Sequence, residues 1–256
     1  MFPIIDIGPF AIQAAGAILL LSLIIASWLT RLFSERIGTN AETLENALFI
    51  GLVSGLLGAR IGFMLQNPSI FLDNPASILS LTPSMLEPSF GLLVGVLGTS
   101  IVMQRNHLPL WPTLDSLTPF FWFLFSAVHL ANFANGNAYG VPTDLPWGIQ
   151  LWNATRHPVQ IYALILTVGF ILWLLIRTKG LSQTGFLRSG MLFIVSLGGI
   201  GAITLFTRAF VAEKIQLIGL DILQLLGFLM LLGAIYMAYT WRFRPRKHIS
   251  VLISMG

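Results

Sequence analysis

Long apolar runs, separated by short polar segments, dominate the pattern of this chain. A helix that crosses a bilayer needs about 20 mostly apolar residues, whereas the strands of a transmembrane barrel alternate between apolar and polar positions. Because the apolar runs are unbroken, they predict an all-α, polytopic membrane protein with seven transmembrane helices. The predicted helices cover residues 8–29, 44–65, 90–103, 117–134, 159–176, 189–210 and 217–239.

Basic residues between these helices predict their orientation. The positive-inside rule assigns the side that carries most of the basic residues to the cytoplasm. The N-terminus is then expected outside and the C-terminus in the cytoplasm. The basic residues on the cytoplasmic side are Arg31, Arg36, Arg105, Arg177, Lys179, Arg188, Arg242, Arg244, Arg246 and Lys247. Those on or toward the outer side are Arg60, Arg156, Arg208 and Lys214.

The composition excludes most other classes of protein. Of the 256 residues, 55% are hydrophobic and 9% are charged, whereas a soluble domain has roughly 25% charged residues. The chain has no cysteine, which excludes a disulfide scaffold, a thiolate zinc site and a cysteine nucleophile. The net charge of +4 follows from the cytoplasmic basic residues, so we expect no nucleic-acid partner. No repeat or soluble segment interrupts the pattern, and we expect residues 1–256 to form a single integral-membrane domain.

Arg60 lies inside the second predicted helix, among glycines that recur every three or four residues. Gly51, Gly55, Gly58 and Gly62 share one helix face, where small residues allow a neighbouring helix to approach closely. An arginine at membrane depth needs a partner or a water-filled cavity, or else it extends its charged end to the headgroups. The sequence leaves both interpretations of Arg60 open, a phosphate-binding residue and a snorkelling residue.

Polar residues gather at the end of the fourth predicted helix. His129, Asn132, Asn135 and Tyr139 follow one another there, interspersed with glycine. Irregular backbone at membrane depth must be surrounded by protein or by water, and amide and hydroxyl groups bind the ester, glycerol and phosphate oxygens of lipids. The alternative is an ordinary outer loop that is rich in turn residues.

The arginines on the outer side depart from the positive-inside trend. Guanidinium groups suit phosphate, so Arg60, Arg156 and Arg208 are candidates for holding an anionic headgroup. The alternative for Arg208 is a surface ion pair with Glu213 or Asp221, which would contribute little stability.

The histidines offer acid–base chemistry rather than a metal site. His129 is a candidate general base, or a residue that forms a hydrogen bond between helices. Neither a His-x3-His nor a HExxH spacing occurs, so we expect no metal.

Two motifs resemble the prolipoprotein diacylglyceryl transferase family. Residues 129–140 are similar to its signature Arg-x-Gly-Asn-Phe-x-Asn-Gly-Glu-x-x-Gly, and residues 156–162 are similar to its Arg-His-Pro-Ser/Thr-Gln-Leu-Tyr. The similarity runs from Pro3 to about Glu213 and includes the Gly-Ala-Arg-x-Gly segment at residues 58–62.

The resemblance implies a seven-span enzyme of the bacterial plasma (inner) membrane that uses no cofactor. Such enzymes transfer diacylglyceryl from phosphatidylglycerol to the lipobox cysteine thiol of a prelipoprotein signal peptide. The implied partners are therefore phosphatidylglycerol, these signal peptides and the surrounding membrane lipids. If this chain is such an enzyme, Arg208 is expected to hold the lipid phosphate. His129, which stands where the family signature has arginine, is the candidate to take over proton transfer. The implied substrate-binding residues are Asn132, Asn135, Arg60, Arg156, Gln160 and Tyr139.

Several positions depart from the family pattern. The histidine that follows Ser-Phe is Gly91, the signature arginine is His129 and the signature glutamate is Asn137. These differences leave a second interpretation open, in which the chain is a non-catalytic, lipid- or lipoprotein-binding membrane relative of the family. A transporter is a third interpretation, but the chain lacks the internal symmetry that transporter folds often show.

Overall fold

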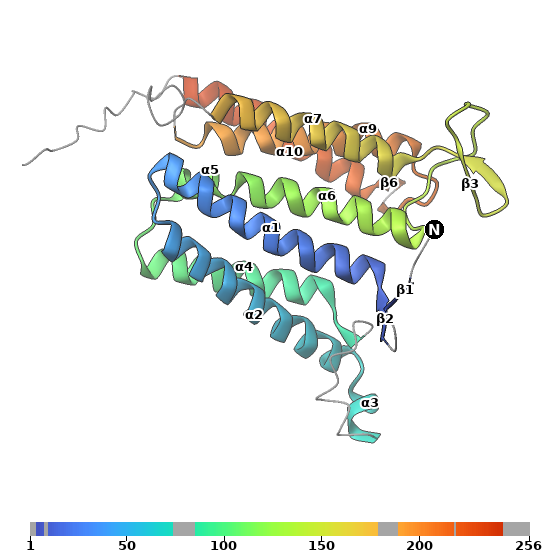
Figure 1. Ribbon diagram of the computed structural model, residues 1–256, viewed down its shortest axis with the longest axis horizontal. Coiled ribbons are helices and arrows are strands. Elements are labelled where there is room, and N and C mark those ends of the chain that lie inside the picture. Colours follow the sequence, from blue (N-terminus) through green and yellow to red (C-terminus); the bar gives the residue numbers. More distant parts are fainter. Residues whose placement is uncertain (1–3, 8–9, 74–84, 179–188, 218, 243–256) are drawn as a thin grey trace, which may run out of the picture. The chain divides into compact units, whose positions relative to one another are not determined.

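The computed structural model describes residues 4–7, 10–73, 85–178, 189–217 and 219–242. Helices make up most of the described chain, and three short antiparallel strand pairs lie at helix ends (Figure 1). The basic residues of the orientation argument that lie outside the described residues are Lys179, Arg188, Arg244, Arg246 and Lys247.

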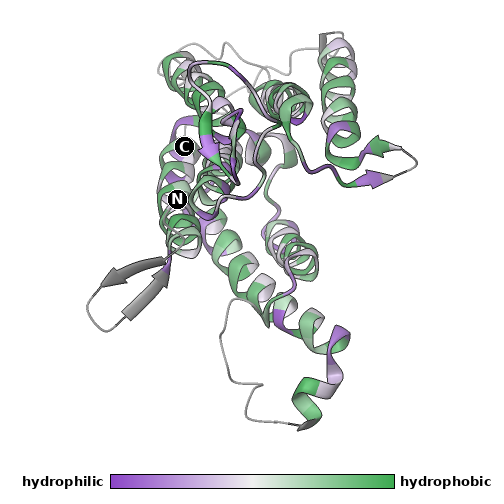
Figure 2. Cartoon of the chain, turned by 90° about the vertical axis from the view of Figure 1, so that its right-hand side faces the viewer, coloured by the Kyte–Doolittle hydropathy of each residue, from purple (hydrophilic) through white to green (hydrophobic). Residues whose placement is uncertain are grey.

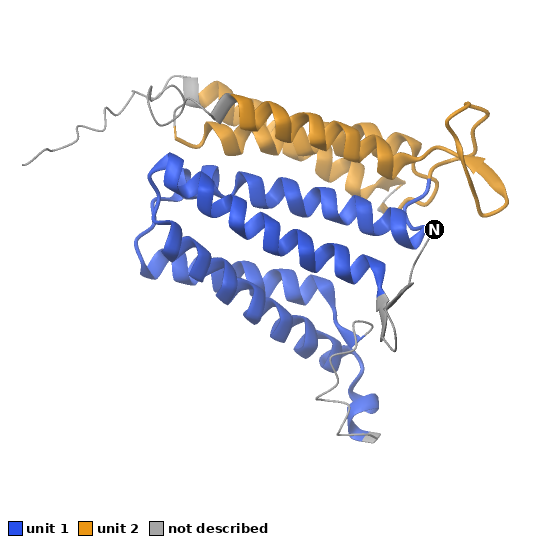
Figure 3. Cartoon of the chain, in the orientation of Figure 1, with its two compact units in different colours: residues 1–139 blue, residues 140–256 orange. Residues whose placement is uncertain are grey.

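The chain divides into two compact units, residues 1–139 and residues 140–256 (Figure 3). The first unit contains β1 (Ile4–Ile7), β2 (Phe10–Gln13), α1 (Ala14–Ile37), α2 (Ala41–Gln66), α3 (Pro68–Asp73), α4 (Pro88–Arg105), α5 (Leu110–Ser116) and α6 (Thr118–Asn135). The second unit contains β3 (Ile149–Leu151), β4 (Ala154–Arg156), α7 (Val159–Thr178), α9 (Met191–Phe210), β5 (Gln216–Leu217), β6 (Leu220–Asp221) and α10 (Ile222–Arg242).

Five helices in the described part of the chain are long and apolar enough to cross a membrane, and the pair α5–α6, bent by 43°, raises that number to six. Colouring by hydropathy shows that the helices are predominantly hydrophobic (Figure 2). Large apolar side chains also face outward: Leu20, Leu21 and Ile24 of α1 are 65%, 61% and 68% exposed. Exposing such apolar surfaces to water is unfavourable, whereas contact with lipid tails is not. This confirms the prediction of a mainly helical, multi-pass membrane protein.

Each of the seven predicted runs overlaps one helix, but the boundaries of the first run are wrong. That run was expected at residues 8–29, whereas α1 begins at Ala14 and ends at Ile37. The residues before it pair as the hairpin β1–β2, because the Gly8-Pro9 dipeptide is a turn signal and proline is a poor helix residue. At its other end α1 continues through a polar turn until Gly38, which has a left-handed φ of 83° and closes the helix.

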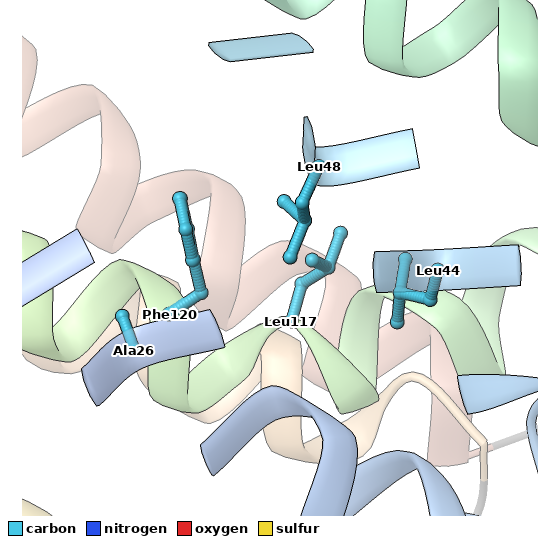
Figure 4. Packing of buried hydrophobic residues seen from close by; sticks show 5 residues of the cluster. All are labelled: Ala26, Leu44, Leu48, Leu117 and Phe120. Atoms are coloured by element: carbon cyan, nitrogen blue, oxygen red, sulfur yellow. The ribbon is translucent and has the colours of Figure 1, made fainter. Parts of the chain in front are cut away.

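The core of the first unit forms where α1, α2 and α6 meet. Ala26 of α1 packs with Leu44 and Leu48 of α2 and with Leu117 and Phe120 at the start of α6 (Figure 4). All five residues are at most 9% exposed. This cluster fixes the start of α6, the helix that carries His129 and the asparagines near its far end.

Glycines let α2 and α4 pack at backbone distance, as their spacing predicts. A Cβ added to Gly95 would lie 2.9 Å from the carbonyl oxygen of Gly51, and one added to Gly55 would lie 3.0 Å from the carbonyl oxygen of Gly91. A Cβ at Gly91 would itself lie 2.9 Å from the Cβ of Ala59. A histidine side chain at position 91 would therefore require α2 and α4 to separate, so this departure from the family motif is built into the helix packing.

The second unit is a bundle of α7, α9 and α10. Gly201 of α9 and Gly227 of α10 allow a close approach of these helices, since a Cβ added to Gly201 would lie 2.7 Å from the carbonyl oxygen of Gly227. The loops and hairpins at the ends of these helices add polar residues to those within the helices, such as Gln160, Thr167 and Ser196.

We expect Gly95→Ala to destabilise the protein by about 1–3 kcal/mol, because the added methyl group meets backbone atoms that cannot rotate away. Gly16→Ala in α1 is the matched control: its Cβ would meet no atom within 4 Å, and alanine favours helix by about 1 kcal/mol. Thermal unfolding of both variants in detergent would measure the difference. Equal midpoints for the two variants would show that α2 and α4 do not pack in this way.

Candidate functional site

The carboxyl end of α9 carries a buried ion pair between Arg208 and Asp221. The Nε–H and Nη2–H groups of Arg208 donate to the two carboxylate oxygens of Asp221, at 2.7 and 2.9 Å. The two residues are 9% and 6% exposed. The sequence offered an ion pair of Arg208 with Asp221 as the alternative to headgroup binding. That pair is formed, but it is buried rather than on the surface. Removing one partner of a buried pair leaves an unpaired charge, so this pair constrains the structure far more than a surface pair.

Asp221 remains ionised because its partners outweigh its burial. Burial raises the pKa of the carboxyl group, but the hydrogen bond and the charge of Arg208, with the backbone N–H groups of Leu223 and Gln224, lower the pKa below its ordinary value. The stabilisation from the pair is therefore present at pH values above the ordinary aspartate pKa. It is lost only as the pH falls through the lowered pKa.

One edge of the Arg208 guanidinium remains available. Besides its two bonds to Asp221, the group donates from Nη2 to the carbonyl oxygen of Glu213 at 3.4 Å. A guanidinium has five N–H donors, so these contacts leave the two donors of Nη1. Among the described residues, no hydrogen bond is formed by Nη1 of Arg208. The pair thus fixes the group in one plane and leaves one edge able to bind an anion.

Residues 140–143 connect the end of α9 to the motif that contains Arg156 and His157. The N–H group of Val141 donates to the carbonyl oxygen of Phe210 at 2.8 Å, and the N–H group of His157 donates to the carbonyl oxygen of Val141 at 3.1 Å. Gly140 permits this path, because a Cβ there would collide with the carbonyl oxygen of His157. The end of α9 and the residues just before α7, more than 50 residues apart in the sequence, therefore both pair with residues 140–143 through isolated bridges.

Arg156 braces this region from within. Its Nε–H donates to the carbonyl oxygen of Leu151 at 3.1 Å, and its Nη1–H donates to that of Gly140 at 3.3 Å. The first bond crosses the hairpin β3–β4, whose turn residues Trp152 and Asn153 have left-handed φ values of 53° and 60°. Paired left-handed residues are typical of tight two-residue hairpins. The described contacts of Arg156 thus give it a structural task, which the sequence did not predict.

Three aromatic side chains near the start of α7 are linked by hydrogen bonds. Trp147 donates from Nε1 to the hydroxyl oxygen of Tyr162 at 2.9 Å, and that hydroxyl lies 3.1 Å from Nδ1 of His157. Because tryptophan is only a donor, the tyrosine hydroxyl is able to donate to Nδ1, which places the proton of a neutral imidazole on Nε2. The His157 ring also packs on Phe210, with ring centroids 5.0 Å apart. Gln160, in the first turn of α7, is 1% exposed.

In the first unit, the predicted polar residues lie together at the end of α6. His129, Asn132 and Asn135 are three residues apart and therefore neighbours on the helix surface. His129 packs edge-on against Phe125, with ring centroids 4.7 Å apart. Gly136, with a φ of 74°, ends the helix, and Tyr139 follows it.

Arg60 lies elsewhere in the first unit, on α2. It is 8% exposed, and its Nη1–H donates to the carbonyl oxygen of Met85 at 3.0 Å. Its guanidinium carbon lies 5.2 Å from the ring centroid of Phe71, within the range of a cation–π interaction. Protein therefore encloses Arg60, and its depth in the membrane stays a prediction. Arg60 holds α3 and Met85 against the end of α2.

The described residues contain no group of three or more His, Asp or Glu side chains arranged to hold a metal ion. The structure thus defines a multi-pass helical membrane protein in which paired or braced arginines, asparagines and histidines are concentrated at helix ends. Guanidinium groups, amides and imidazoles are suited to binding an anionic headgroup.

Comparison with known proteins identifies the family. A family model described as prolipoprotein diacylglyceryl transferase matches residues 3–240, and the chain belongs to this family. A phosphatidylglycerol–prolipoprotein diacylglyceryl transferase of Salmonella arizonae is 27% identical over 280 residues, which cover 96% of this chain and 95% of the relative. Proteins of the same name from Cupriavidus pinatubonensis and Polynucleobacter asymbioticus are 33% and 32% identical, over 68% and 66% of this chain and 67% and 70% of their own lengths.

We expect Arg156→Lys to loosen residues 140–157 locally. Lysine cannot bridge two carbonyl oxygens with a rigid fork, so the amides of Thr143 and His157 should exchange about tenfold faster, the effect of losing roughly one hydrogen bond. Hydrogen exchange read by mass spectrometry would measure this. Arg105→Lys, at the exposed end of α4, is the control and should leave these peptides unchanged. Unchanged exchange in Arg156→Lys would argue against the bracing role.

Proposed function

We propose that this protein transfers the diacylglyceryl group of phosphatidylglycerol to the lipobox cysteine thiol of a prelipoprotein. Family membership over residues 3–240 supports the reaction, and the fixed guanidinium of Arg208 with its available Nη1 edge is the observation that carries it. The names of the relatives mention the same lipid and the same protein substrate.

The reaction places defined demands on the protein. The thiol loses its proton, its sulfur forms a C–S bond to the glyceryl carbon, and the C–O bond to the phosphate breaks. Glycerol phosphate leaves with the electron pair of that bond, so negative charge grows on the phosphate in the transition state. A positioned guanidinium stabilises that charge without reorganising, and this is the task of Arg208.

The remaining assignments follow the chemistry of each group. His129 accepts the thiol proton, because imidazole is the side chain best suited to general-base work near neutral pH. The amides of Asn132 and Asn135 and the hydroxyl of Tyr139 bind headgroup oxygens. Arg60 on α2, Arg156 on β4 and Gln160 in the first turn of α7 support substrate binding.

We expect Arg208→Ala to lower the rate of transfer at least 100-fold while the protein still inserts in the membrane, because one preorganised donor to a developing oxyanion is worth about that factor. Purified protein, phosphatidylglycerol and a lipobox peptide would be assayed for thioether and released glycerol phosphate. Arg105→Ala, which removes an exposed arginine of α4, is the matched control.

Two results of that assay would reject the proposal. Normal transfer by Arg208→Ala would show that Arg208 does not stabilise the leaving phosphate. Lipid binding by the wild-type protein without product would favour the non-catalytic, lipid- or lipoprotein-binding interpretation.

The proposed topology has seven spans in the bacterial plasma membrane, with the N-terminus outside, the C-terminus in the cytoplasm and the whole chain acting as one domain. Helix α4, the third span along the chain, would bring the number of spans from six to seven. It is apolar along its middle, and its 18 residues end in the polar pair Gln104 and Arg105. The predicted cytoplasmic position of Arg105 and the smaller number of basic residues on the outer side support this orientation.

The absence of native cysteine makes the topology directly testable. In intact cells, a membrane-impermeant thiol reagent should label Asp144→Cys, on the outer side, and should label Asn106→Cys only after the membrane is permeabilised. Both residues are exposed. Labelling of Asn106→Cys in intact cells, or protection of Asp144→Cys, would invert or break the proposed arrangement.

A further inference from the structure

Asp221 is held more firmly than an ordinary counter-ion. Its backbone pairs with Gln216 in the hairpin β5–β6, and the next residue, Ile222, donates its N–H group to the carbonyl oxygen of Ile215 at 2.9 Å. Its carboxylate oxygen Oδ1 accepts the N–H group of Leu223 at 3.2 Å, at the beginning of α10. The carboxylate is therefore fixed to the start of α10 before it meets Arg208.

This anchoring determines where the guanidinium lies. Arginine has a long side chain with many rotamers, and ordering it during substrate binding opposes binding. Here the fork of Nε and Nη2 fits both carboxylate oxygens at 2.7 and 2.9 Å, so the plane of the group is fixed in advance. The edge that remains, Nη1, points away from the fork by the geometry of the guanidinium itself.

We propose that Asp221 is a positioning residue, which holds Arg208 so that its Nη1 edge meets the phosphate of a phosphatidylglycerol headgroup. This inference rests on the proposed function and deepens it, because it assigns a task to a residue outside both family-like motifs. Asp221 does not contact the substrate: it acts through Arg208. Its charge also offsets that of Arg208, so geometry rather than net charge carries the effect.

Loss of this positioning should lower kcat and leave KM nearly unchanged. In Asp221→Asn, one carboxylate oxygen becomes an NH2 group that faces an N–H donor of Arg208, so the fork is lost while the positive charge remains. We expect kcat to fall about 10- to 100-fold, with KM for phosphatidylglycerol within about threefold of the wild-type value. Asp221→Glu keeps the carboxylate one methylene further out and should recover part of the lost kcat. Asp144→Asn, an exposed acidic residue of the same unit, is the control and should match the wild type.

A second measurement separates positioning from a general loss of stability. In an Arg208→Lys background the fork no longer exists, so adding Asp221→Asn should lower kcat by less than about threefold. Equal losses in both backgrounds would mean that Asp221 merely supports the fold, and the inference would be wrong. A KM that rises as much as kcat falls would overturn it as well.

A spectroscopic arm distinguishes this inference from the proposed function. In protein labelled with 15N-arginine, the Arg208 signals would be assigned by their absence in Arg208→Lys and followed on transfer from phosphatidylcholine to phosphatidylglycerol nanodiscs. In the wild type the Nε–H signal should stay fixed and only the Nη signals should move, whereas in Asp221→Asn the Nε–H signal should move too.

That pattern without thioether product would reject the proposed transfer and retain the positioning role. Product without that pattern, and with a wild-type kcat in Asp221→Asn, would reject the positioning role alone.

Discussion

Hydrocarbon offers no hydrogen-bond partner, and this constraint governs every level of the structure. Backbone groups must be satisfied within each segment, so the chain forms long helices. Without water between them, helices gain little from the hydrophobic effect and must pack by close contact. The glycines of α2 with α4, and of α9 with α10, provide that contact at backbone distance. Irregular backbone and charged side chains are consequently displaced to the helix ends.

The arginines proposed for the site lie near helix ends or, for Arg156, on the short strand β4 that precedes α7. Arg60, Arg156 and Arg208 each donate hydrogen bonds to backbone carbonyls or to a buried carboxylate. Arg60 and Arg156 use these bonds to brace neighbouring segments. Arg208 differs because its ion pair with Asp221 leaves one edge able to bind an anion, and the proposed role in binding a lipid phosphate rests on that edge. In the proposed mechanism, the charge of Arg208 that is partnered for stability is also the charge that is oriented toward the substrate.

The sequence predicted much of this, for physical reasons that act locally. Apolar runs of sufficient length predict helices wherever they occur, and the glycine spacing of α2 predicts its close neighbour, because both signals depend on residues within a few turns of each other. The boundaries of α1 and the role of Arg60 were less accessible. The Gly-Pro dipeptide, a turn signal in the sequence, competes with the apolar run that precedes α1, and the partners of Arg60 include a carbonyl 25 residues away.

The sequence by itself determined the class of this protein, its membrane helices and its family, because hydropathy, residue spacing and motif order are properties of the linear chain. Tertiary structure alone decided that the pair of Arg208 and Asp221 is buried, that Gly91 leaves no room for a side chain, and that Trp147, Tyr162 and His157 form one hydrogen-bonded chain. Burial and hydrogen-bond direction arise only when separate segments are brought together, and no local pattern encodes them.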